Sequence, residues 1–189
     1  MTETFTAFEG ERRLAFGPLA EVALAVKRVE GRAFAPIAVF SDSTGRAVDL
    51  DLRGSDEDVV ARLAETPAAE TPRGRGRPRL GVVAREVTLL PRHWEWLNAQ
   101  PGGASVALRK LVEEARRANG DRDRQRAARD AAYHFMSAMA GNLPNFEEAS
   151  RALFADDRTR FVGQIAGWPA DIRDHVVKLA YRDRADQFP

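Results

Sequence analysis

Residues 84–118 read AREVTLLPRHWEWLNAQPGGASVALRKLVEEARRA. The run from Val82 to Leu90 is rich in apolar and β-branched residues, which is typical of a strand. Pro91 suits the first position of a helix, and Pro101-Gly102-Gly103 would end that helix. Ser105 is a suitable cap for a second helix with an apolar face. The stretch therefore predicts the order strand, helix, helix.

This order resembles the ribbon-helix-helix proteins, the Arc/MetJ class of DNA-binding proteins, over Ala84 to Ala118. The pieces that carry the resemblance are Val87-Thr88-Leu89-Leu90-Pro91, the helix from Arg92 to Leu97, and Gly102-Gly103-Ala104-Ser105. The resemblance implies a homodimer through residues 82–118, in which two strands pair as an antiparallel ribbon and enter the major groove. It also implies that Gly103, Ala104 and Ser105 hold a DNA phosphate at the start of the second helix.

The register of the strand decides which side chains such a ribbon presents. Counted back from Pro91, the residues Arg85, Val87 and Leu89 face outward, and Glu86 and Thr88 face the core. A slip of one residue would bury Val87 and Leu89 and expose Glu86 and Thr88, which is physically better because it buries apolar groups. The register stays open at this point, so Arg85 and Thr88 are both candidate DNA contacts.

Residues 73–79 read RGRGRPR, with four arginines and no apolar side chain. Gly and Pro disfavour a helix here, so we expect an extended string of cations. The part from Arg75 to Arg79 resembles the AT-hook, which lies in the minor groove of A·T-rich DNA. That resemblance implies contacts from Arg75, Gly76, Arg77, Pro78 and Arg79. The alternative is a basic flexible linker within residues 66–80.

Positive charge is concentrated in the middle of the chain. Residues 1–70 have a net charge of −5, residues 71–118 a net charge of +6, and residues 119–189 a net charge of 0. This distribution favours a polyanionic partner. The candidates for contacts with a DNA backbone are Arg73, Arg109, Lys110, Arg116 and Arg117.

The two flanking regions predict an α+β fold class. Residues 1–65 indicate a small domain of order ββαββα, with strands near Phe5 to Phe8, Leu14 to Phe16, Ile37 to Phe40 and Val48 to Leu52. Residues 119–189 indicate a helical domain with breaks at Asn119-Gly120, Gly141 to Pro144 and Gly167 to Pro169. The expected domains are therefore 1–65, 66–80 (linker), 81–118 and 119–189.

Composition excludes several classes of protein. The chain has no Cys, so it has no disulfide or thiolate zinc site. No apolar run approaches the roughly 20 residues of a membrane span, and the N-terminus lacks the features of a secretory signal. The three histidines, His93, His134 and His175, lie on separate predicted helices and are read as surface or packing residues. We expect no enzymatic activity, no cofactor and no metal, in a cytoplasmic, nucleoid-associated protein.

These observations predict a DNA-binding homodimer, either a transcriptional regulator or an architectural protein, with a preference for A·T-rich double-stranded DNA. The N- or C-terminal domain would bind a possible protein partner. The alternative is a dimeric adaptor or antitoxin-like protein whose arginine tract is only a linker. The whole chain also resembles a bacterial family of uncharacterised proteins that carries Gly-Arg-Pro-Arg-Leu-Gly at residues 76–81 and Trp-x-Trp-Leu at residues 94–97.

Overall fold

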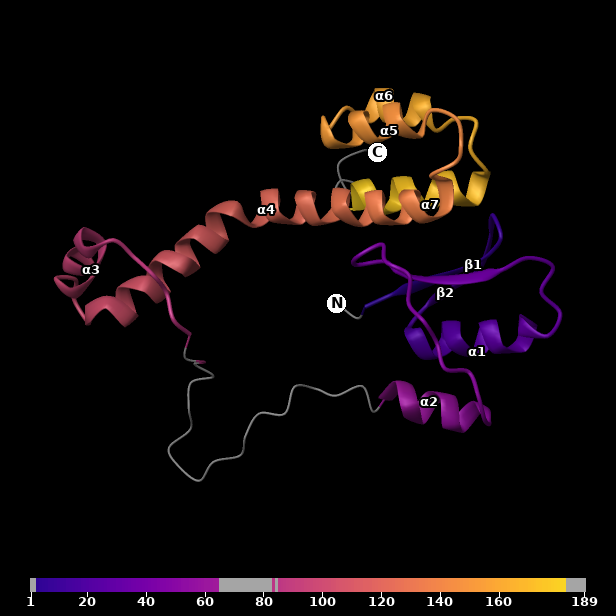
Figure 1. The fold of residues 1–189 in the computed structure, drawn as a ribbon, viewed down its shortest axis with the longest axis horizontal. Coiled ribbons are helices and arrows are strands. Elements are labelled where there is room, and N and C mark those ends of the chain that lie inside the picture. Colours follow the sequence, from indigo (N-terminus) through magenta and orange to yellow (C-terminus); the bar gives the residue numbers. More distant parts are fainter. Residues whose placement is uncertain (1–2, 65–82, 84, 183–189) are drawn as a thin grey trace. The chain divides into compact units, whose positions relative to one another are not determined.

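Three short antiparallel strands organise the first part of the chain in this computed structural model, which describes residues 3–64, 83 and 85–182 (Figure 1). Strands β1 (Phe5–Glu9) and β2 (Arg12–Gly17) form a hairpin, and Gly10 in its turn has a φ of +57°. Glycine suits this position because it has no Cβ to clash in the left-handed region. Strand β3 (Ile37–Ser41) pairs with the other side of β1, so the strand order is β2-β1-β3.

The sheet is buried on both faces, because apolar residues occupy both sides of β1 and β3. On one face, Phe5, Ala7 and Val39 pack with Val22 and Val26 of helix α1 (Leu19–Glu30). On the other face, Phe8 and Phe40 pack with Phe135 and with residues of the C-terminal helices. Figure 1 shows the strands lying between α1 and these helices.

The fold is α+β, as the sequence predicts, and helices make up most of the remaining described chain. Their bounds are α2 (Asp56–Ala64), α3 (Pro91–Asn98), α4 (Gly103–Ala140), α5 (Phe146–Phe154), α6 (Arg158–Gln164) and α7 (Ala170–Tyr181). The Asp157 side chain caps α6 by accepting a hydrogen bond of 3.0 Å from the N–H of Arg160. Among the described residues, no helix is both long and apolar enough to cross a membrane.

The chain forms two units. Unit 1 is Met1–Thr66 together with Arg122–Pro189, and unit 2 is Pro67–Asp121. We expected residues 1–65 and residues 119–189 to be separate domains, but Phe8 and Phe40 share one core with Phe135, Ile172 and Val176. The short N-terminal sheet has two apolar faces and one helix of its own to cover them, so the second face is buried by the C-terminal helices.

The expected strand at Val48 to Leu52 does not form. Ala47 makes an isolated bridge to Phe40, and the N–H of Val48 donates to the carbonyl of Val39 over 2.8 Å. Beyond Val48 the backbone leaves β3, although Val48, Leu50 and Leu52 still pack against the core. The alternation of apolar and polar residues therefore arises because one side of an extended segment is buried, and not because the segment pairs as a strand.

The expected break at Asn119-Gly120 is also absent, because α4 continues through it to Ala140. One glycine inside a helix costs only about 1 kcal/mol relative to alanine. The side-chain amide of Asn119 donates to the carbonyl of Ala115 over 2.8 Å, one turn earlier in the same helix. A pair of helix-disfavouring residues is thus tolerated within a long helix.

Candidate functional site

The candidate nucleic-acid site falls in unit 2, which the structure describes at residue 83 and residues 85–121. Arg73, Arg75, Gly76, Arg77, Pro78 and Arg79 lie outside the described residues. The other candidate residues are described: Arg85, Thr88, Ser105, Arg109 and Lys110 are exposed, and Gly103 is half-buried. The five exposed side chains are therefore accessible to a partner, whereas Gly103 could offer only its backbone.

The predicted strand before α3 is not assigned between residues 85 and 90. Leu90 is nevertheless extended, with φ −65° and ψ 149°, and Pro91 begins α3 at the expected position. Glu86, Val87 and Thr88 are all exposed. In a single chain, neither of the two alternating sets of side chains in this segment is therefore buried. A strand requires a hydrogen-bonded neighbour, and in the described part of unit 2 this segment has none.

Helix α4 begins at Gly103, where the sequence predicts a phosphate anchor. Gly102 and Gly103 have φ values of +86° and +74°, a backbone conformation that glycine adopts at little cost. The N–H of Gly103 donates to the carbonyl of Gln100 over 2.9 Å. Ala104 and Ser105 lie in the first turn of α4, where N–H groups have no acceptor within the helix. The start of α4 can thus accept an anion.

The cations in the described part of unit 2 fall into two groups. Arg116 and Arg117 both pair with the carboxylate of Glu113, at 3.0 Å and 3.6 Å. Within the described residues, no ion pair is found for Arg85, Arg92, Arg109 or Lys110. The second group consequently retains its full charge for an external anion.

Unit 2 exposes many large apolar side chains and buries few. In its described part only Leu97 and Ala107 are buried. Trp96 is 53% exposed, and Val112 is 63% exposed. Leu111 is four residues after the buried Ala107, so the apolar stripe of α4 continues past its buried part. The exposed large apolar residues are Val83, Val87, Leu90, Trp96, Leu111 and Val112.

A second polar cluster, which the sequence did not reveal, lies inside unit 1. Asp42 is 4% exposed and accepts hydrogen bonds from the hydroxyls of Thr4 and Thr6, at 2.9 Å and 2.7 Å. The ammonium group of Lys178 lies 3.2 Å from the same carboxylate. Asp42 and Lys178 are 136 positions apart in sequence, and no short motif connects them. The three donors compensate the buried negative charge.

His175 lies next to this carboxylate but is not bonded to it. Its Nε2 is 3.7 Å from Asp42 Oδ1, which is too long for a hydrogen bond, and neither ring nitrogen has a partner. The rings of Phe8 and Phe135 lie 5.4 Å and 4.6 Å from the imidazole. Burial lowers the pKa of His175 to about 4, and the nearby Asp42 charge only partly opposes this shift. His175 is therefore neutral near pH 7 and enclosed away from any substrate.

The buried histidine predicts a loss of stability in mild acid. The unfolded chain has the ordinary histidine pKa of 6.5 and takes up a proton before the folded chain does. The contribution of His175 to the free energy of unfolding should be constant above pH 6.5. It should fall by roughly 3 kcal/mol as the pH drops from 6.5 toward 4. Urea titrations at several pH values measure this. The variant His175→Phe should flatten the profile between pH 6.5 and 5, and an unchanged profile would show that another group titrates there.

The chain is an α+β protein whose sheet and C-terminal helices share one core, and it belongs to a bacterial protein family. The family is described as "Uncharacterized protein conserved in bacteria (DUF2239)", and its model matches residues 4–180. The match spans both units. No curated protein and no solved structure matches the chain.

Proposed function

We propose that this chain is a DNA-binding protein that acts as a homodimer through residues 82–118. Arg75, Arg77 and Arg79 would lie in an A·T-rich minor groove, with Gly76 and Pro78 keeping the strip extended. Arg73, Arg109 and Lys110 would contact the sugar-phosphate backbone, and either Arg85 or Thr88 would face the DNA from the ribbon, according to the register of the strand. The first turn of α4, at Gly103 and Ser105, would receive a phosphate. The role would be that of a transcriptional regulator or an architectural, nucleoid-associated protein.

The observation that carries this proposal is the exposed apolar surface of unit 2 beside cations without ion pairs. Two buried side chains in the described part of unit 2 cannot support a core, because small units bury too little of their surface. A second copy would cover Val83, Val87, Leu90, Leu111 and Val112. It would also supply the neighbour that the extended segment before Pro91 needs in order to form a strand. Ribbon-helix-helix dimers solve both problems in this way.

Fluorescence anisotropy with an A·T-rich and a G·C-rich duplex tests the DNA-binding part. We expect tight binding at low salt, a preference for the A·T-rich duplex and a steep loss of affinity with added salt. The triple variant Arg75→Ala, Arg77→Ala, Arg79→Ala should weaken binding about 100-fold or more, since each groove contact contributes about 1–3 kcal/mol. It should leave the dimer intact in sedimentation equilibrium.

The matched control removes three exposed arginines from unit 1, Arg12, Arg28 and Arg32. It changes the net charge by the same amount and should change DNA affinity only slightly. If both triple variants lose the same DNA affinity, the arginine tract contributes only non-specific positive charge. A dimer that binds neither duplex at low salt would favour the adaptor or antitoxin-like function, with the tract as a linker.

A further inference from the structure

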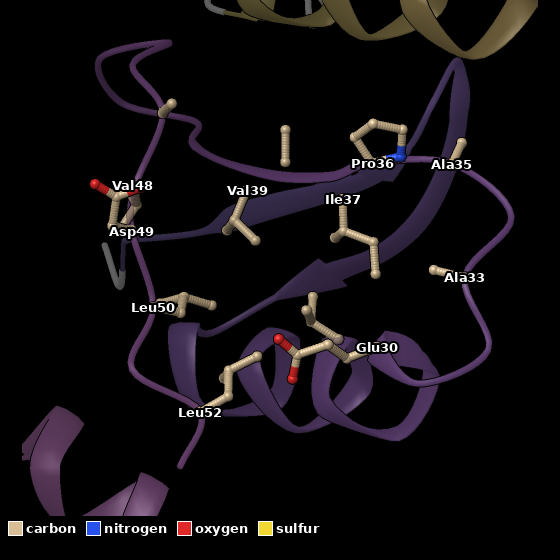
Figure 2. A pocket seen from close by; sticks show the side chains of 13 residues that line it. Glu30, Ala33, Ala35, Pro36, Ile37, Val39, Val48, Asp49, Leu50 and Leu52 are labelled. Atoms are coloured by element: carbon tan, nitrogen blue, oxygen red, sulfur yellow. The ribbon is translucent and has the colours of Figure 1, made fainter.

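Unit 1 contains a pocket of about 560 Å³ beside strand β3 (Figure 2). Its walls are largely aliphatic and come from α1, from β3 and from the segment that follows β3. The side chains used in the argument below are Val26, Ile37, Val39, Val48, Leu50 and Leu52. Figure 2 shows Leu50 and Leu52 on one side of the pocket and Ala33 and Ala35 on the other, with β3 between them.

The pocket lies along the free edge of the sheet. In the register of β3 with β1, Ala38 and Phe40 direct their backbone groups toward β1, and Ile37 and Val39 direct theirs outward. The carbonyl of Val39 accepts from the N–H of Val48, and the pairing stops there. Within the described chain, no hydrogen bond reaches the N–H of Val39 or either backbone group of Ile37. Val39 is 5% exposed and Val48 already lies against its outer side, so the N–H and the carbonyl of Ile37 are the two groups of this edge that are available for an added strand.

Two carboxylates, Glu30 and Asp49, are the charged side chains of this pocket. Figure 2 shows Glu30 reaching from α1 toward the middle of the pocket. Neither carboxylate has an ion pair within the described residues. Nearby Asp51, by contrast, pairs with Arg53 and Arg62, both at 2.8 Å. The pocket therefore keeps a net charge of −2 while the neighbouring carboxylate is neutralised, and it favours a cationic ligand.

We propose that this pocket binds an extended, basic segment of a partner protein, which adds as a short strand to the free edge of β3. A pair of main-chain hydrogen bonds with Ile37 would fix the segment, as in other β-strand additions. Aliphatic side chains of the segment would face Val26, Leu50 and Leu52. Lysine or arginine side chains next to these aliphatic ones would reach Glu30, which lies one turn after Val26 on α1, and Asp49 on the segment after β3.

The size of the edge limits the length of the bound segment. The open part of the edge begins at Ile37 and ends where Val48 pairs with Val39. Loop residues Ala33 and Ala35 bound the pocket on one side and the segment from Val48 to Leu52 bounds it on the other. The site thus suits three or four residues of a chain. The pocket lies wholly in unit 1, so the proposal is independent of DNA binding by unit 2.

The test uses ¹⁵N-labelled full-length chain and the hexapeptide acetyl-(Lys-Val)₃-amide. Saturable chemical-shift changes are expected at the backbone amides of Ile37 and Val39, with slower hydrogen exchange at Ile37. Two control peptides separate the contributions. Glutamate in place of lysine should weaken binding at least tenfold, because it places like charges together. N-methylation of the valines should abolish binding, because it removes donors and blocks the edge without altering the protein.

The protein variants test the two carboxylates directly. Glu30→Gln combined with Asp49→Asn should weaken binding of the lysine peptide about fivefold, as expected for two partly exposed ion pairs. Glu21→Gln, on the same helix but not lining the pocket, is the matched control and should have no effect. Shift changes that leave out Ile37 and Val39, or equal affinity for the lysine and glutamate peptides, would overturn the proposal. So would an N-methylated peptide or hexylamine that binds as well as the lysine peptide, since that would assign the pocket to small cationic ligands.

Discussion

Replacing Phe135 with alanine is expected to lower the free energy of unfolding by about 3–5 kcal/mol. Phe135 has no exposed surface, and its ring lies 5.2 Å from that of Phe8 and 5.0 Å from that of Phe40. Phe8 and Phe40 belong to the N-terminal sheet, and Phe135 belongs to α4. The substitution therefore opens a cavity where the two distant segments of unit 1 meet.

Urea denaturation followed by circular dichroism measures this loss. Phe34→Ala is the matched control, because the Phe34 side chain is completely exposed, and it should change stability by no more than about 0.5 kcal/mol. If Phe135→Ala does not fold, Phe135→Leu keeps most of the volume and should cost about 1–1.5 kcal/mol. A cost below about 1 kcal/mol for Phe135→Ala would contradict a core shared by residues 1–65 and 119–189.

Gly45→Ala is expected to cost about 3 kcal/mol or more for two additive reasons. Gly45 has a φ of +66°, where a residue with a Cβ pays about 1–2 kcal/mol. A Cβ there would also lie 1.8 Å from the carbonyl oxygen of Ala131, which belongs to the backbone of α4. A helix backbone cannot yield as a flexible side chain does, so the turn after β3 has to move away, and overpacking of this kind adds about 1–3 kcal/mol.

The displaced turn carries further contacts with α4. His134 Nδ1 lies 3.1 Å from the carbonyl of Thr44, and Arg46 Nη2 lies 3.1 Å from His134 Nε2. A carbonyl can only accept and a guanidinium can only donate, so both bonds form when neutral His134 carries its proton on Nδ1. We expect Gly45→Ala to break this pair of bonds, which the His134 imidazole resonances would report.

Two glycines elsewhere separate the two causes. A Cβ on Gly31 would meet nothing within 4 Å, and Gly31 has a negative φ, so Gly31→Ala should be nearly neutral. Gly103 has a φ of +74° but also open space, so Gly103→Ala should cost only the conformational part. Thermal denaturation of the three variants ranks them. If Gly45→Ala is no worse than Gly103→Ala, the turn does not approach Ala131 as closely as described.

The sequence predicted most of the local structure because the relevant signals are local. The order ββαββα predicted a helix between the two pairs of strands, where α1 lies. Pro91 marked the start of α3, and the breaks at Gly141 to Pro144 and Gly167 to Pro169 fall between helices. The predicted strand at Val48 to Leu52 and the predicted break at Asn119-Gly120 were wrong, because each sequence pattern is compatible with two local structures. Alternating apolar residues at Val48 to Leu52 also suit an unpaired extended segment, and Asn119-Gly120 is weak enough to remain inside a helix.

The sites divide in the same way. The arginine tract and the glycines before α4 are candidates that the sequence indicates by itself, because each lies within a few residues of sequence, and they stay predictions. The Asp42 and His175 cluster and the acidic pocket beside β3 were missed. Their members come from separate elements, such as Thr6 in β1, Lys178 in α7, Glu30 in α1 and Asp49 after β3. No spacing in the sequence brings such residues together.

The sequence alone determined the α+β class, the separation of charge along the chain and the location of most helices, since composition and short-range periodicity are properties of neighbouring residues. Only the tertiary structure decided that the sheet takes its second cover from the C-terminal helices. It also decided that Asp42 is buried and compensated, that His175 is neutral, and that the backbone groups of Ile37, at the start of β3, have no partner among the described residues. Each of these depends on which distant surfaces meet, because burial and uncompensated charge follow from the environment that a residue acquires on folding.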